Sequence, residues 1–258
     1  DGAELNCGKL ASVVFSQMHL YLVGSASAQA RLGLSALARD ALGIKYFRLS
    51  AAERQATSFE SVLDRLFASL PVEPEQECPH ERFRFAPHPD TCTCKRMTGI
   101  VSRLIHHPRI LAQTHERLPI YYGRANTSLL VHGSRCVEHE RLVNADGQNI
   151  YVTEDNIQRY LDLPIALLHG DQNALFDVES AHRTMQQLER LHPAVCRQGL
   201  MRTIIAKDFG HFDCTIGHGA PMREQILDPI TRFLKDAWAY DRPLEPPHGD
   251  DNPKTTRV

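Results

Sequence analysis

Two apolar runs that each precede a glycine turn constrain the fold of this chain most. Leu163–Gly170 is the first run, and Leu200–Ala206 is the second, with a turn at Gly210 and His211 after it. Between the runs, a stretch beginning near Asp177 has apolar residues at every third or fourth position, which is typical of an amphipathic helix. Continuous apolar runs of this length are typical of strands buried on both faces. The strand-helix-strand order predicts a parallel sheet with the residues after each strand at one edge.

The rest of the chain adds one strand and several helices. Leu10–Ser16 is a short apolar, β-branched run that predicts a further core strand. Apolar spacing predicts helices over residues 28–43, 58–70, 97–105, 109–117 and 123–131, a short strand or extended segment at 150–152, and a closing helix at 221–238. Gly43 and Ser58 are the expected C-cap and N-cap of the first two helices, and Pro229 is expected to kink the last one.

This pattern predicts one α/β domain over residues 1–240. Several short helices in series are typical of a cap over a sheet, so we expect a helical cap insertion over about residues 24–135. Residues 241–258, rich in proline and charge, are expected to form a disordered tail.

Composition excludes several classes of protein. The net charge is −2 and no basic run is longer than Lys95-Arg96, so nucleic acid is not an expected partner. No apolar stretch approaches the roughly 18 residues that a transmembrane helix needs. The 7 cysteines are an odd number at low density, which favours a reducing compartment such as the cytoplasm.

The turn after the second run carries the best candidate for acid–base chemistry. An acyl-transfer site needs a histidine that moves a proton and a carboxylate that orients its ring, and His211 suits the first role. The alternative is a turn histidine that bonds a backbone carbonyl. Asn173 holds the position where a carboxylate is expected, but an amide cannot offset the charge of an imidazolium. Asp171 and Asp213 are the possible replacements, and Asp213 is also suited to anchoring the turn through backbone hydrogen bonds.

Other imidazole and thiol side chains are assigned structural roles. His169 at a strand end is expected to bond locally, and Cys214 is expected to pack in the turn. Cys7 lacks the preceding strand that a nucleophile needs. One segment contains residue types that zinc binds, but its Cys-x-Cys spacing is tight and a polar loop is the preferred interpretation, so no metal is predicted at Cys78, His80, His88, Cys92 or Cys94.

Several segments together resemble the C-terminal part of α/β-hydrolase domains, found alone or joined to glucose-methanol-choline oxidoreductases of the cholesterol oxidase type. The similarity covers about Leu10 to Leu234. The matching segments are Phe15-Ser16-Gln17, Leu66-Phe67 to Pro74, Cys94 to Thr98, Gly123 to Asn126, Leu142 to Gly147, Leu163 to Phe176 and Gly210 to Gly217.

The resemblance implies that His211 is a base and that the cap encloses an apolar acyl or sterol pocket. Related domains also carry asparagine at the position of Asn173. No Gly-x-Ser-x-Gly or Gly-x-Cys-x-Gly motif occurs in the chain, so we expect the nucleophile elbow and oxyanion hole to precede Asp1. The expected activity is ester or lipid hydrolysis on a small ester, lipid or sterol-like substrate without a cofactor, and the chain alone is expected to be inactive.

Two alternatives remain open. The chain could be the hydrolase-like domain of a flavin oxidoreductase, although it contains no Gly-x-Gly-x-x-Gly motif that would bind FAD within these residues. FAD is therefore expected only if an oxidoreductase domain is fused upstream. It could also be a degenerate hydrolase fold that serves in interaction, which the missing elbow and Asn173 favour.

Overall fold

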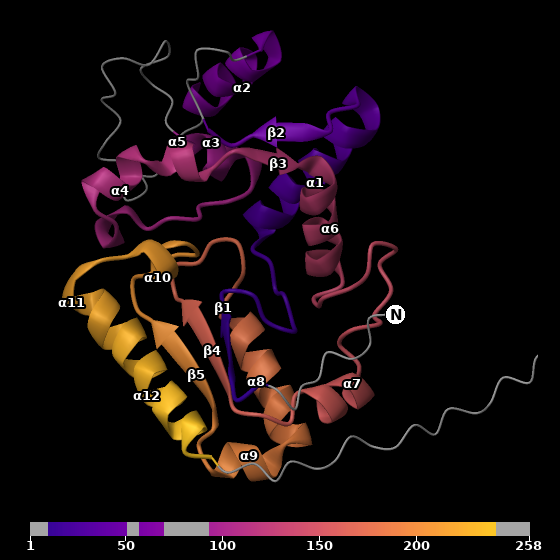
Figure 1. The fold of residues 1–258 in the computed structure, drawn as a ribbon. Coiled ribbons are helices and arrows are strands. Elements are labelled where there is room, and N and C mark those ends of the chain that lie inside the picture. Colours follow the sequence, from indigo (N-terminus) through magenta and orange to yellow (C-terminus); the bar gives the residue numbers. More distant parts are fainter. Residues whose placement is uncertain (1–9, 51–56, 70–92, 241–258) are drawn as a thin grey trace, which may run out of the picture.

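The chain forms a mixed α/β structure on one parallel sheet (Figure 1). The computed structural model describes residues 10–50, 57–69 and 93–240. Strands β1 (Val13–Ser16), β4 (Ile165–Gly170) and β5 (Met201–Ala206) pair in parallel in the order β1-β4-β5. The carboxyl ends of the three strands therefore lie at one edge, as the sequence predicts.

Strand β4 is buried on both faces between helices. All of its residues are buried, and alternate side chains enter two different apolar clusters. Ile165 packs in the cluster with helix α8 (Glu179–Leu191), whereas Ala166 packs in the cluster with helix α12 (Asp228–Trp238). Successive side chains of a strand point to opposite faces, so a strand covered on both sides must be apolar at every position.

A second region of helices and one small sheet lies beyond the carboxyl edge of the strands (Figure 1). It occupies the part of the sequence where the cap is expected, and we call it the cap region. Its two strands pair antiparallel. Its elements are α1 (Ala26–Leu42), β2 (Tyr46–Arg48), α2 (Ser58–Ser69), α3 (Thr93–Ile100), η3 (His107–Arg109, a 3-10 helix), α4 (Ala112–Glu116), α5 (Leu118–Tyr121), β3 (Arg124–Asn126) and α6 (Thr127–Glu138).

Several short helices surround the parallel sheet. We call the sheet, α8, α12 and these short helices the sheet region. The short helices are α7 (Glu154–Tyr160), α9 (Pro193–Arg197), α10 (Asp213–Ile216), α11 (Gly219–Met222) and the π-helical turn η4 (Arg223–Leu227). No helix among residues 10–50, 57–69 and 93–240 is both long and apolar enough to cross a bilayer.

Several predicted boundaries in the cap region are wrong. Residues 123–131 do not form one helix, because Arg124–Asn126 pairs with β2 and the helix starts only at Thr127. Helix α3 begins at Thr93 and ends at Ile100, so most of residues 97–105 are not helical. The N-cap of α2 is Thr57 rather than Ser58, because the Thr57 hydroxyl accepts from the Glu60 N–H and the Glu60 carboxylate accepts in return from Thr57.

In the sheet region a strand that the sequence allows is absent, and the helix around Pro229 is irregular. Residues 150–152 form no strand, and Thr153 instead caps α7, which the periodicity does not predict. Pro229 lies inside a continuous helical stretch over residues 219–238, and the π-helical turn just before it interrupts the regular α-helix where a proline N–H is missing. The predicted tail at residues 241–258 lies outside the described residues.

Candidate functional site

The turn after β5 is held against the end of β4 by a close backbone approach. A Cβ on Gly170 would lie 2.2 Å from the carbonyl oxygen of Phe209 and 2.7 Å from that of Gly210. Only glycine leaves room for the two backbones at this distance. This contact brings His211, which follows Gly210, next to the loop that follows Gly170.

His211 contacts the side chain that the sequence places at the acid position. The amide nitrogen Nδ2 of Asn173 lies 3.2 Å from Nδ1 of His211 and 2.9 Å from Oε1 of Gln17. The amide oxygen of Asn173 accepts from the backbone N–H groups of Leu175 and Phe176. These two bonds fix the amide orientation, so Asn173 presents a donor to His211.

This donor determines where the neutral imidazole of His211 carries its proton. Because Asn173 donates to Nδ1, that nitrogen is an acceptor and the proton resides on Nε2. Burial, with a smaller contribution from neighbouring His169, lowers the pKa of His211 from 6.5 to about 4. His211 is therefore neutral near neutral pH, with Nε2–H as a donor and no hydrogen-bond partner for it among the described residues.

Gln17 completes this constellation and was not among the predicted site residues. It follows β1 at the same edge, is 3% exposed and has a φ of 64°, a left-handed conformation rare for a residue other than glycine. Its Oε1 accepts from both the Gly170 N–H and the Asn173 amide. Strained backbone held by buried hydrogen bonds is typical of functional sites. The sequence signals are its place directly after a core strand and its position in the matching segment Phe15-Ser16-Gln17.

Asp213 anchors the turn and does not contact His211 through a hydrogen bond. Its carboxylate accepts from the Gly210 N–H at 2.6 Å and from the His106 N–H at 3.1 Å. The side chain is fully buried, and burial raises its pKa against the opposing effect of these bonds. These are the backbone contacts that the sequence predicts for an anchoring residue.

Asp171 lies at the same edge but faces another segment. Its side chain is exposed, and Oδ1 accepts from the Asp208 N–H at 2.6 Å. No hydrogen bond or ion pair joins Asp171 to His211, and both residues are described. Asn173, not a carboxylate, is therefore the side chain in contact with His211 Nδ1.

His169 pairs with a second buried histidine behind the site. Nε2 of His169 donates to the carbonyl of Phe176 at 3.2 Å, so Nδ1 accepts from Nε2 of His19 at 3.1 Å. Burial lowers the pKa of His19 to about 3 and that of His169 to about 4. Both rings are neutral, and His169 bonds the nearby Phe176 as expected and also the distant His19.

Cys214, the thiol in the turn after β5, is not suited to act as a nucleophile. Cys214 is 2% exposed, and burial together with the Asp213 carboxylate raises its pKa to about 12, so it stays protonated. Cys7 lies outside the described residues, as do Cys78, His80, His88 and Cys92.

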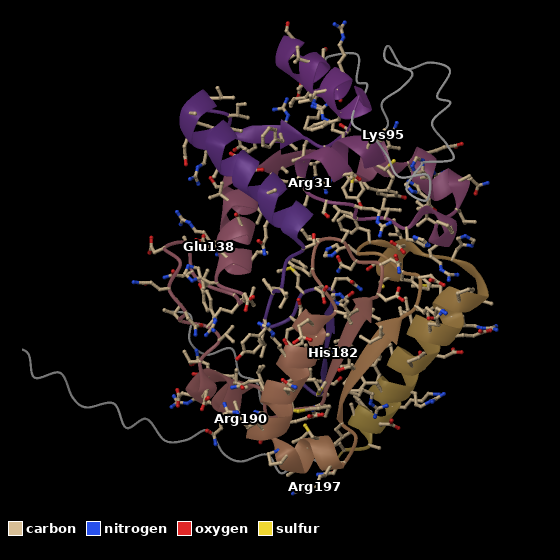
Figure 2. All side chains as sticks on the ribbon, turned by 180° about the vertical axis from the view of Figure 1, so that it is seen from behind. Arg31, Lys95, Glu138, His182, Arg190 and Arg197 are labelled. Carbon is tan, nitrogen blue, oxygen red and sulfur yellow. The ribbon has the colours of Figure 1, made fainter. Side chains whose placement is uncertain are left out.

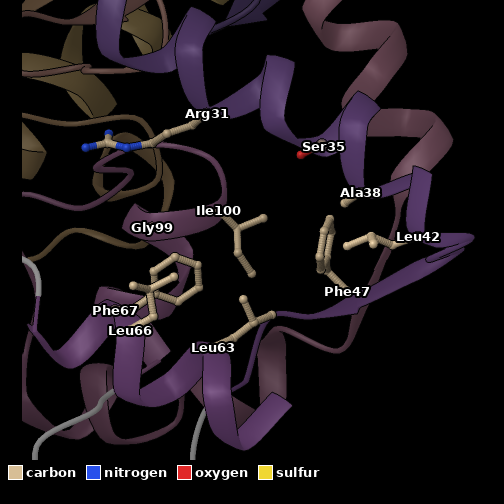
Figure 3. A pocket seen from close by; sticks show the side chains of 10 residues that line it. All are labelled: Arg31, Ser35, Ala38, Leu42, Phe47, Leu63, Leu66, Phe67, Gly99 and Ile100. Carbon is tan, nitrogen blue, oxygen red and sulfur yellow. The ribbon is translucent and has the colours of Figure 1, made fainter. Parts of the chain in front are cut away.

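The cap region contains an apolar cavity of about 240 Å³ (Figure 3). It is lined by α1, α2, α3 and β2, and its walls are almost entirely apolar. Arg31 of α1 is the one charged side chain in this lining, and it points away from the apolar end (Figure 3). Burial lowers the pKa of the Arg31 guanidinium. The lining residues are Arg31, Ser35, Ala38, Leu42, Phe47, Leu63, Leu66, Phe67, Gly99 and Ile100.

Neither protein-family models nor curated proteins match this sequence. The site must therefore be interpreted from its own geometry.

Proposed function

We propose that the chain is part of an α/β-hydrolase-type domain that acts on an ester or lipid with an apolar acyl or sterol-like group. The observation that carries this proposal is the contact between His211 Nδ1 and Asn173 at the carboxyl edge of the sheet. A hydrolase orients its histidine through Nδ1 and leaves Nε2 for the reaction. The sequence contains no nucleophile elbow, so the proposal requires a nucleophile from another segment.

The hydrogen bonds of Asn173 restrict what His211 does in such a site. With its proton on Nε2, the ring donates to a substrate oxygen but cannot accept a proton there. Moving the proton to Nδ1 would bring two N–H groups face to face, because the Asn173 oxygen is held by Leu175 and Phe176. We therefore assign His211 a donor role toward the carbonyl or leaving-group oxygen of the ester.

The apolar cavity supports an apolar substrate. Ligand sites are lined mainly by apolar side chains with a few polar groups that fix orientation. The cavity of about 240 Å³ has this character, with Arg31 as its single charged group. An acyl chain suits such a lining better than a polar substrate does.

Hydrolysis by the full-length native protein tests the proposal. Its rate on p-nitrophenyl esters of increasing acyl length should fall by about 10²- to 10⁴-fold on His211→Ala, the range typical for loss of proton transfer or donation in the transition state. His182→Ala is the matched control, because His182 is exposed near the start of α8 (Figure 2) and forms no hydrogen bond with Asn173 or His211. Full activity of His211→Ala would refute the catalytic role.

A non-catalytic ligand-binding domain is the second candidate, and Asn173 favours it. An amide donor in place of a carboxylate leaves His211 without the partner that stabilises an imidazolium. In that case the wild type binds an apolar ester without cleaving it, and His211→Ala weakens binding only. Calorimetric titration with a non-hydrolysable ether analogue separates the two candidates.

Asn173→Asp tests the tautomer directly. A carboxylate at this position would accept from Nδ1–H and should raise the pKa of His211 from about 4 by roughly 1–3 units. Nitrogen chemical shifts of the ring report both the protonated atom and the pKa. An unchanged tautomer would show that Asn173 does not control His211.

A further inference from the structure

Three potential metal ligands that are far apart in the sequence meet in the cap region. Cys94 is in α3, His107 in η3 and His115 in α4, and one ligand atom from each lies within 4.8 Å of the other two. The Sγ of Cys94 lies 3.4 Å from Nε2 of His115. The rings of His107 and His115 are 5.2 Å apart between centroids.

The separation of Cys94 and His115 is that of two ligands on one tetrahedral ion. With Zn–S near 2.3 Å and Zn–N near 2.0–2.1 Å, a sulfur and a nitrogen ligand lie about 3.5 Å apart. The third ligand atom belongs to the partly buried His107 and lies within 4.8 Å of the other two, so binding of the ion would require it to move closer. Sulfur and imidazole nitrogen are the ligand types that select zinc over magnesium or calcium.

The burial of the cluster suits a structural ion. Cys94 is 6% exposed and His115 is 3% exposed, so their polar atoms are removed from bulk water. Zinc binding exchanges a thiol proton for the metal and offsets the thiolate charge at such a position. An ion here would tie three short elements together, two of which, η3 and α4, are too short to be stable alone.

The cluster also borders the segment that supports the His211 turn. His106, next to His107, donates its N–H to Asp213, and Arg109 at the end of η3 forms an ion pair with Asp208. The Phe212 N–H donates to the carbonyl of Leu104 in the same segment. An ion bound to His107 would therefore also hold the backbone from Leu104 to Arg109, which anchors the turn.

We propose that Cys94, His107 and His115 bind one zinc ion that holds the cap region on the turn after β5. This inference is independent of the proposed hydrolase activity, because it rests on the cap cluster alone. Three protein ligands leave one tetrahedral position for a further ligand.

Cobalt substitution of the purified chain tests this site. After removal of metal by a chelator, Co²⁺ should bind one per chain with the visible bands of a tetrahedral ion and a near-ultraviolet thiolate-to-cobalt charge-transfer band. Zinc should displace cobalt, abolish these bands and raise the Tm, because it binds the folded state. Absence of the charge-transfer band in the wild type would overturn the proposal.

Matched variants locate the ion. Cys94→Ser should abolish the charge-transfer band and weaken zinc binding by more than about 100-fold, since even loss of an outer-shell partner costs 10- to 100-fold. Cys136→Ser, at a buried cysteine of α6 outside the cluster, should leave both unchanged. His107→Gln, at a less buried position, is the second variant if Cys94→Ser fails to fold by circular dichroism. Wild-type affinity in a folded Cys94→Ser or His107→Gln would place the metal elsewhere and overturn the proposal.

Discussion

The sheet region and the cap region are built on different principles. Around the sheet, buried apolar side chains form two continuous clusters on either side of β4. In the cap region, the interior also includes a buried ion pair between Arg96 and Asp64 and the cluster of Cys94, His107 and His115. The sheet region confines its buried polar groups mainly to the carboxyl edge, where Gln17, Asn173 and His211 meet.

This difference separates two sources of stability. Apolar burial is non-directional and tolerates small changes in geometry, whereas a buried ion pair needs both partners in place. Short helices with little apolar surface depend on such specific contacts. The cap region should therefore be more sensitive to the loss of one polar partner, and the sheet region to the loss of apolar volume.

The largest effect is expected from breaking the buried ion pair. Nη1 of Arg96 lies 2.8 Å from Oδ1 of Asp64, and both side chains are at most 1% exposed. Arg96→Met removes the guanidinium from beside a buried carboxylate and should lower the free energy of unfolding by about 3–5 kcal/mol. Urea denaturation measures this loss. The double variant Arg96→Met with Asp64→Leu should recover most of it, and a double variant as unstable as the single one would show that charge is not the cause.

In the sheet region, loss of apolar volume should have the next largest effect. Leu188 of α8 is fully buried against β4, so Leu188→Ala should cost about 2–5 kcal/mol in unfolding free energy. Leu234→Ala is the control, because Leu234 of α12 is 45% exposed. Equal losses in the two variants would contradict the assignment of the core.

The buried histidine pair should make the sheet region sensitive to acid. His19 titrates at about 3 in the folded chain and near 6.5 when unfolded, so the folded state binds fewer protons. Its contribution to stability is present above about pH 6.5 and is lost as the pH falls toward 3. At pH 5 the loss is about 2 kcal/mol. His19→Gln should reduce the fall in unfolding free energy between pH 7 and pH 5 by this amount, whereas His182→Gln should not.

The smallest effect is expected at the end of α1. Gly43 has a φ of 65°, and its N–H bonds the last carbonyls of the helix. Gly43→Ala should cost about 1 kcal/mol, because a Cβ is strained in this conformation. A Cβ on Gly123 would meet no atom within 4 Å, and the φ of Gly123 is not in the positive range, so the Tm of Gly123→Ala should be almost unchanged. A similar Tm shift for both would exclude backbone strain as the cause.

Sequence-based prediction succeeds where apolar burial shapes the structure and fails where specific contacts do. Strands β4 and β5 and helix α8 are predicted because their apolar periodicity reports a face that is buried. Strand β3 is missed because its three residues form a strand only by pairing with β2, and its sequence has no strand pattern. Helix α7 is missed because a polar seven-residue helix depends on the Thr153 cap and on burial of Ile157.

The candidate site divides in the same way. The spacing after Gly170 and the turn at Gly210 predict that Asn173 and His211 lie at one edge. The direction of the hydrogen bond between them depends on the backbone N–H groups of Leu175 and Phe176. These groups donate to the Asn173 oxygen and thereby fix the orientation of the amide. Gln17 and His19 join the site across about 150 residues of sequence, a distance over which local patterns carry no information.

The sequence by itself therefore determined the parallel sheet, its flanking helices and the edge at which polar residues collect, because apolar periodicity encodes burial. The tertiary structure decided which polar groups meet there and which ring nitrogen of His211 carries the proton. It also decided which cysteine and histidines form the cap cluster. Hydrogen bonds and metal coordination depend on distances of a few ångströms between segments far apart in the chain, and only the folded packing sets those distances.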